Sequence, residues 1–158
     1  MERLNAIIEQ LENSGVQIDW HRISGIEGYT RIHENGEVYM AVDPQLSTSR
    51  KAAVAYHEAG HFYCGLGELS DKNEFRADSW AARQLIVPEE IVQAVKDGIK
   101  NVYELAEKLD VDQEYLEHCL RILKIVRGPY IEHKQYVIWL DPITIYDRET
   151  EQFWPEEN

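Results

Sequence analysis

The sequence predicts an α+β fold that is mainly helical and that places a small antiparallel sheet beside one central helix. Three observations lead to this prediction. Residues 1–46 begin with apolar residues at helical spacing and continue with short runs in which apolar and polar residues alternate, separated by turn residues. This order is typical of a helix followed by short strands. Residues 47–97 carry apolar residues at helical spacing. Residues 98–158 begin with a helical pair and finish with alternating strands.

The length and the charge of the chain limit the classes of protein to which it can belong. Its 158 residues suffice for one domain with its own core, and no stretch resembles a linker between two domains. The formal net charge of -13 argues against broad electrostatic binding of nucleic acid. Cys64 and Cys119 fit no disulfide framework. The acidic first turns do not resemble a signal peptide, and no apolar run is long enough to span a membrane, so we expect a soluble, cytoplasmic protein.

The N-terminal part is predicted to form one helix and a small sheet. Residues 1–13 place apolar side chains at positions i, i+3, i+4 and i+7, and a Ser-Gly pair ends this helix. Residues 16–20 alternate between apolar and polar side chains, as a strand does. Residues 29–33 and 37–42 flank an Asn-Gly turn, which is a strong hairpin signal.

Residues 49–64 are predicted to form a helix that is apolar on nearly every side and therefore buried. It contains the pattern H-E-x-x-H, formed by His57, Glu58 and His61. On a helix the two histidines point the same way and can clamp a divalent metal, with Glu58 placed to take a proton from a water molecule. Burying two histidines and a glutamate costs free energy unless their polar groups are paired or bind a metal. The alternative is a surface helix that carries two histidines by chance.

The next helix, from about residue 71 to 86, offers a third ligand. A catalytic zinc usually has three protein ligands and one open position. Glu74 and Asp78 lie four residues apart on one face, so Glu74 can supply the carboxylate ligand and Asp78 can accept the outer N–H of a ligating histidine. Glu74 also forms a capping box with Asp71. Asp71 can cap the helix while Glu74 faces the metal, so both interpretations stay open.

These two motifs resemble the ImmA/IrrE family of metallopeptidases over about residues 37–97. That family pairs H-E-x-G-H with a helix of the form E-x-x-A-(D/N)-x-(F/W)-A, and this chain has H-E-A-G-H and E-F-R-A-D-S-W-A. The resemblance implies a single zincin-like metallopeptidase domain. It further implies that His57, His61 and Glu74 hold Zn²⁺ and that Glu58 is the general base.

The resemblance also implies an activity and a class of partner. Members of the family often lie in prophages and mobile elements beside a repressor gene, and they cleave that repressor or help to inactivate it. We therefore expect a zinc-dependent endopeptidase that acts on a cytoplasmic DNA-binding repressor, and the acidic charge suits a basic partner. The chain departs from the family pattern at Ala59, where a larger apolar residue is common, and at Arg76, where many members have a second glutamate.

Two other functions remain open. One is a metal-binding regulatory module that senses a signal or displaces a partner without proteolysis. Cys64 lies three residues after His61, and as a fourth protein ligand it would close the site and favour this function. The other is a zinc hydrolase of a non-peptide amide, although the chain lacks the upstream Cys ligand of a deformylase-like enzyme. The donor that would stabilise an oxyanion is also undecided among four side chains: Tyr56, Tyr63, Tyr115 and His118.

Residues 38–42 directly precede the helix with the two histidines. In zinc peptidases generally, an edge strand beside the metal can bind substrate as an added strand. We therefore hypothesise that Val38 to Val42 lines the cleft. An ordinary buried strand is equally compatible with this pattern.

The C-terminal part is predicted to contain three helices and two strands. Pro88 begins a short helix, and Asn101 begins the first of two further helices. Residues 113–120 of the second contain no Lys or Arg, so we expect packing or protein docking there and no direct contact with nucleic acid. Residues 136–140 and 143–146 are predicted to be strands. The acidic tail from residue 147 is expected to be frayed, with packing of Phe153 and Trp154 back onto the domain as the alternative.

Overall fold

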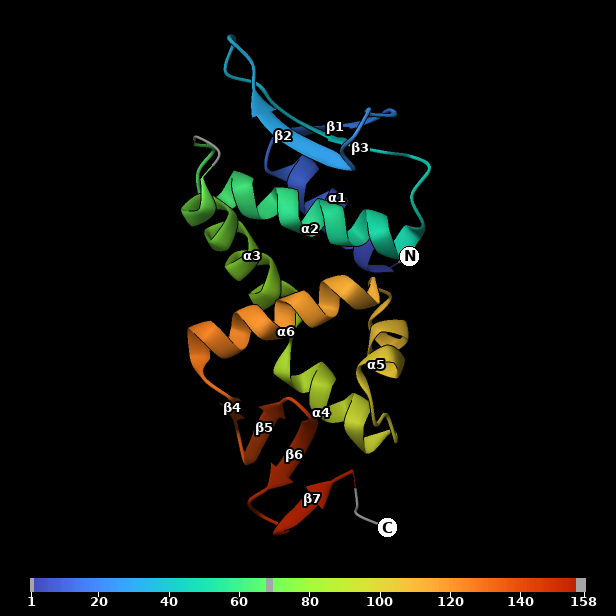
Figure 1. Ribbon diagram of the computed structural model, residues 1–158, viewed down its shortest axis with the longest axis vertical. Helices are drawn as coiled ribbons and strands as arrows, with labels where there is room; N and C mark the ends of the chain where they lie inside the picture. Colours follow the sequence, from blue (N-terminus) through green and yellow to red (C-terminus); the bar gives the residue numbers. More distant parts are fainter. Residues whose placement is uncertain (1, 68–69, 156–158) are drawn as a thin grey trace.

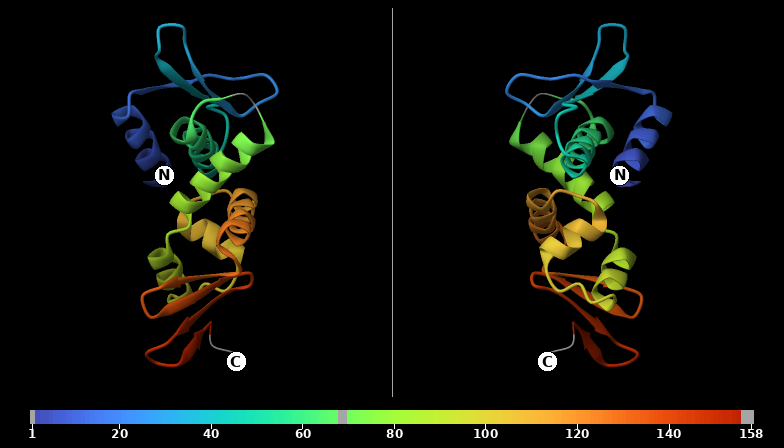
Figure 2. Two further views of the ribbon diagram at one scale, coloured as in Figure 1. Left: turned by 90° about the vertical axis from the view of Figure 1, so that its left-hand side faces the viewer. Right: turned by 90° about the vertical axis from the view of Figure 1, so that its right-hand side faces the viewer.

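The computed structural model describes residues 2–67 and 70–155, and over these residues it contains six helices and two small sheets (Figure 1). The fold is therefore α+β, as predicted. The three-stranded sheet lies at one end of the molecule and the four-stranded sheet at the other, with the helices between them. Two helices, α2 and α6, run in similar directions through the middle, and α3 crosses between them (Figure 2).

The N-terminal part forms a helix and three strands, close to the predicted positions. The elements are α1 (Glu2–Asn13), β1 (Val16–Trp20), β2 (Gly28–Ile32) and β3 (Val38–Val42). The apolar stripe of α1 is buried and packs against α2, because its side chains recur at helical spacing on one face.

The sheet beside α2 is mixed, which corrects the predicted antiparallel sheet. β3 lies in the centre, parallel to β1 and antiparallel to β2, so that Ile18 and Thr30 both lie opposite Met40. The second half of β3 is fully buried at this central position, including Met40 and Val42. An alternating pattern specifies the two faces of a strand but not its neighbours. The hypothesis that Val38 to Val42 is an edge strand lining the cleft is wrong, since β2 is the edge strand that contacts α2.

The two central helices are α2 (Thr48–Cys64) and α3 (Asp71–Leu85). The side chain of Ser70, and not that of Asp71, caps α3 by accepting a hydrogen bond from a backbone N–H of the first turn. A serine at this position satisfies one of the N–H groups that lack a partner at a helix start. The predicted capping box of Asp71 and Glu74 is therefore wrong, because Ser70 and not Asp71 is the N-cap residue.

The remaining helices are α4 (Pro88–Lys96), α5 (Val102–Leu109) and α6 (Gln113–Arg127). Asn101 caps α5 and Asp112 caps α6, each by accepting a backbone N–H with its side chain. Their apolar faces join those of α1, α2 and α3 in one cluster of buried residues. None of the helices in the described part of the chain is long and apolar enough to cross a membrane.

The C-terminal sheet has four antiparallel strands where the sequence predicted two. They are β4 (Tyr130–His133), β5 (Tyr136–Leu140), β6 (Ile143–Asp147) and β7 (Gln152–Trp154), paired in chain order. β4 and β7 have only four and three residues, too few for an alternating pattern to stand out. The expectation of a frayed tail is wrong as far as residue 155, and the alternative is confirmed, because β7 pairs with β6 and Trp154 packs against the core. Residues 156–158 of that tail lie outside the described residues.

Candidate metal centre

The close crossing of α2 and α3 brings the predicted site residues together. A Cβ atom at Gly60 would lie 2.4 Å from the carbonyl oxygen of Ala77 and 2.7 Å from its Cα, so the helices can approach this closely only because residue 60 has no side chain. Gly60 lies between the two histidines of the H-E-x-x-H pattern, and Ala77 lies between Glu74 and Asp78. The crossing therefore places both acids of α3 against both histidines of α2.

His57, His61 and Glu74 form a group whose ligand atoms all lie within 4.8 Å of one another. The Nε2 atoms of the two histidines are 3.2 Å apart. Each of the two carboxylate oxygens of Glu74 lies 3.3 Å from one of these nitrogens. Ligands of a tetrahedral zinc, with bonds of about 2.0–2.1 Å, are about 3.3 Å apart, so these separations fit a metal ion.

Asp78 joins His57 to a third histidine, His118 of α6. One oxygen of Asp78 lies 2.8 Å from His57 Nδ1, and the other lies 2.7 Å from His118 Nε2. Burial acts to raise the pKa of Asp78, but its hydrogen bonds with His57 and His118 outweigh burial and hold the pKa below its usual value. The ionised carboxylate can only accept, so Nδ1 of His57 carries the proton that it donates. In the neutral ring, Nε2 is then free to bind a metal.

The same hydrogen bond affects the protonation of His57. Burial acts to lower its pKa, but the hydrogen bond and the negative charge of Asp78 hold the pKa above the usual value. A cation bound at Nε2 would therefore compete with a proton that His57 holds more firmly than an ordinary histidine does.

Glu58 lies beside these ligands in the wall of a cavity of about 340 Å³. Its side chain is buried, and burial raises the pKa of Glu58 above the usual value, although the neighbouring His57 acts to lower it. A carboxylate with a raised pKa is a stronger base than an exposed one, which suits it to accept a proton.

The cavity extends from His57 and Glu58 along α2 towards the start of that helix. Ala53 and Val54 form its apolar wall, one turn before His57. Gly28 at the start of β2 borders it closely, because a Cβ there would lie 2.4 Å from Cγ1 of Val54. Tyr115 of α6 lines the other side. The cavity is therefore a cleft between the edge strand β2 and helix α6, with α2 as its floor.

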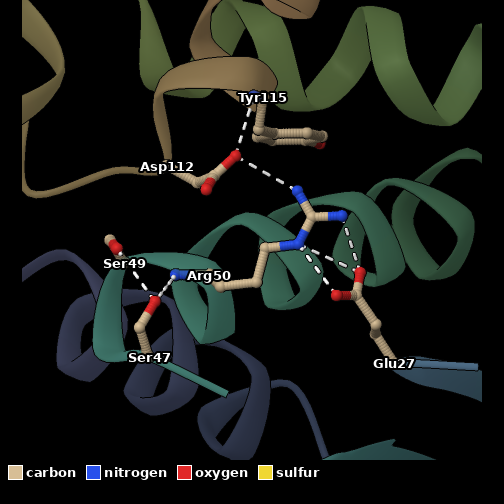
Figure 3. Close-up of polar contacts among 6 residues, drawn as sticks. All are labelled: Glu27, Ser47, Ser49, Arg50, Asp112 and Tyr115. Atoms are coloured by element: carbon tan, nitrogen blue, oxygen red, sulfur yellow. Dashed lines mark hydrogen bonds and ion pairs between the residues drawn. The ribbon is translucent and has the colours of Figure 1, made fainter. Parts of the chain in front are cut away.

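Arg50 also lines this cleft, seven residues before His57 on α2, and Figure 3 shows its polar contacts. Its Nε and Nη2 atoms donate to the two oxygens of Glu27, at distances from 2.6 to 3.1 Å. Its Nη1 donates to Asp112 at 3.1 Å, and the same Asp112 oxygen accepts the backbone N–H of Tyr115. Arg50 thus joins the segment before β2 to the first turn of α6.

Three residues of the cleft were not predicted from the sequence as site residues: Arg50, Glu27 and Gly28. Helical spacing could have found Arg50, because it lies seven residues before His57 and so on the same face of α2. Glu27 and Gly28 had no local signal, because only the sheet pairing brings the start of β2 to the cleft.

The structure separates the four candidate oxyanion donors. Tyr115 and His118 line the cleft. Tyr56 faces another hollow, between α1 and α4, and the hydroxyl of Tyr63 is 2.8 Å from that of Ser14. The Tyr115 hydroxyl is buried beside the Cys119 thiol, whereas His118 is partly exposed. His118 is therefore the candidate that a molecule in the cleft can reach.

Cys64 does not belong to the group of candidate ligands. Its sulfur lies 3.5 Å from the carbonyl oxygen of Arg76, and the group found among the described residues comprises His57, His61 and Glu74. The fourth position of a tetrahedral metal at this site would thus be left for a non-protein ligand, as in catalytic sites.

Comparisons of the chain with protein-family models, with curated proteins and with solved structures found no match. The site itself defines a group of two histidines and one glutamate that could hold a metal ion, beside a buried glutamate in a cleft.

Proposed function

We propose that this protein is a zinc-dependent endopeptidase. The observation that carries the proposal is the convergence of His57, His61 and Glu74, with donor separations of 3.2–3.3 Å, next to the buried Glu58. Two histidines and a carboxylate are a ligand set of catalytic zinc, and the open fourth position distinguishes it from a structural site. The resemblance of the two motifs to the ImmA/IrrE family points to the same chemistry.

The residues of the cleft have separate roles in this proposal. Zn²⁺ held by the three ligands would act as a Lewis acid on the scissile carbonyl and lower the pKa of a water molecule. Glu58 takes the proton of the attacking water and passes it to the leaving amine. Asp78 fixes the tautomer and the orientation of His57. The Nε2–H of His118 donates to the other oxygen of Asp78, so His118 would donate to the oxyanion from Nδ1 and would need the doubly protonated ring to do so.

The edge strand β2 supplies a place for an extended substrate. Within residues 2–67 and 70–155, β3 is the only strand paired with β2, so the other edge of β2 has backbone groups that an added strand could pair with. Gly28 of β2 borders the cleft, and the Thr30 hydroxyl donates to the backbone carbonyl of Glu58 at 3.4 Å. A substrate chain paired with this edge would pass over the face of α2 that carries the ligands.

We infer that the substrate is a specific intracellular protein, such as the transcriptional repressor of a phage or another mobile element. Two features support this inference: the resemblance of the motifs, and the net charge of -13, which favours encounters with a basic DNA-binding protein.

The test compares metal content and cleavage in four proteins: the wild type, Glu58→Gln, Glu74→Ala and the exposed control Glu12→Gln. Each is assayed for zinc by atomic emission, and for cleavage of a repressor encoded beside its gene by mass spectrometry. We expect zinc near one equivalent in all but Glu74→Ala, because Glu58 is not a ligand. We expect cleavage by the wild type and Glu12→Gln alone.

Two results would count against the proposal. If Glu58→Gln inactivates the repressor as well as the wild type does, the protein is a metal-binding regulatory module whose action does not require proteolysis. If Glu74→Ala retains its zinc, the three-ligand site is wrong.

A further inference from the structure

One face of the C-terminal sheet carries a row of aromatic rings that the proposed peptidase site does not use. Tyr130 of β4 lies opposite Trp139 of β5, with ring centroids 6.1 Å apart. Tyr146 of β6 lies opposite Phe153 of β7, with centroids 4.7 Å apart. The ring of Phe153 also lies 6.2 Å from that of Trp139. These four residues, the aromatic row, therefore cross all four strands.

The aromatic row lies on the outward face of this sheet. The alternate residues of the same strands, including Ile131, Ile138 and Ile145, are buried in the core, on the side where α4 and α6 contact the sheet. Tyr130 and Phe153 are 44% and 53% exposed. The sheet lies at the end of the molecule beyond α4 and α6, away from the helices α2 and α3 that carry the candidate metal ligands (Figure 1).

The surroundings of the aromatic row are acidic. Glu149 and Glu151, in the turn between β6 and β7, are exposed. In residues 2–67 and 70–155, no Lys, Arg or His lies within ion-pair distance of either carboxylate. Arg148, in the same turn, is neutralised by Glu132 at 2.8 Å. The row therefore combines exposed rings with negative charge that has no partner in the described chain.

We propose that the aromatic row is a docking surface for a basic, arginine-containing segment of a partner protein. A planar guanidinium stacks on aromatic faces and also pairs with carboxylates, so it matches both features of this surface. Lysine, as a strongly hydrated point charge, matches the carboxylates but stacks less well.

Two other occupants fit the surface less well. Single-stranded nucleic acid also stacks on aromatic rows of this kind. Its phosphates would meet Glu149 and Glu151 on a chain with a net charge of -13. A second copy of the chain would bring the same acidic groups face to face, which like-charge repulsion disfavours.

The test measures binding of a fluorescein-labelled hexa-arginine peptide to the full chain by fluorescence anisotropy. We expect the double variant Tyr130→Ala/Phe153→Ala to raise the Kd about tenfold, because two stacking rings are lost while every charge is retained. The matched control is Tyr103→Ala, which removes an exposed tyrosine on α5 whose hydroxyl donates to Glu107. The control should bind as the wild type does, and hexalysine should bind several-fold more weakly than hexa-arginine.

NMR of the tryptophan side chains gives a second measurement that does not depend on the folding of the double variant. The peptide should shift the indole N–H signal of Trp139, assigned with Trp139→Phe, more than those of the other three tryptophans.

Three results would overturn the proposal. Equal binding by the double variant and the control would mean that general charge alone attracts the peptide. Tighter binding of a labelled oligothymidylate than of hexa-arginine would assign the row to nucleic acid. Concentration-dependent dimerisation that is lost in the double variant would assign it to a second copy.

Discussion

Gly60 of α2 lies against the backbone of Ala77 of α3, so closely that a Cβ at residue 60 would be 2.4 Å from the Ala77 carbonyl oxygen. We predict that Gly60→Ala forces the helices apart and lowers both stability and zinc affinity. Alanine favours a helix over glycine by about 1 kcal/mol, but overpacking against backbone costs about 1–3 kcal/mol. The net effect should be destabilising, as measured by urea denaturation and by competition for zinc with a chromophoric chelator.

Gly67→Ala is the matched control for this substitution. A Cβ at Gly67 would approach only the side-chain amide of Asn73, at 2.9 Å, and a side-chain end can shift where backbone cannot. If both variants lose zinc affinity equally, the crossing at Gly60 is not what positions the ligands.

Asp78→Asn should change both the strength and the pH dependence of zinc binding. Asp78 holds the pKa of His57 above its usual value of 6.5, so in the wild type a proton competes with the metal up to a higher pH than at an ordinary histidine. Affinity should therefore fall as the pH decreases through this raised pKa. In Asp78→Asn the fall should begin at a lower pH, because the charge that raised the pKa is gone. The affinity at high pH should be about 10–100-fold weaker, because His57 loses its orienting carboxylate.

Zinc titrations of both proteins across the pH range in which histidine titrates would check this prediction. A variant with unchanged pH dependence would show that Asp78 does not control the protonation of His57.

Arg50→Gln should reduce stability by about 1 kcal/mol, because the ion pairs of Arg50 with Glu27 and Asp112 are partly exposed and so partly screened. The decrease should shrink in high salt, as expected for a loss of ion pairs. Lys51→Gln, which removes a positive charge from the next residue of α2, is the control and should change stability less. Urea denaturation at low and high salt measures the stability of both variants. If Arg50→Gln and Lys51→Gln lose the same amount of stability, only the net charge matters and not the ion pairs of Arg50.

The two cysteines should differ in reactivity. Cys119 is fully buried, and burial raises the pKa of its thiol to about 12, so little reactive thiolate forms near neutral pH. Cys64, at the end of α2, is half-buried. A disulfide reagent should therefore modify Cys64 in the native protein and Cys119 only after unfolding. Cys64→Ser should abolish the native reaction, and rapid modification of that variant would show that Cys119 is accessible.

The sequence by itself determined the helices and the identity of the candidate ligands. Apolar residues at helical spacing predicted α1, α2 and α3 close to their observed ends, because helical periodicity is a local property. The spacing of His57 and His61 placed them on one face of α2, and the four-residue spacing of Glu74 and Asp78 did the same on α3.

The tertiary structure decided the features that depend on contacts between distant residues. The pairing of β1 with β3 made β2 the edge strand, and strand order cannot be read from alternation within one strand. His118 lies in the cleft because α6 packs against α3. Arg50 contributes to it because the segment before β2 lies beside the start of α2. Such long-range contacts follow from how whole faces pack together, and a local pattern carries no information about which face meets which.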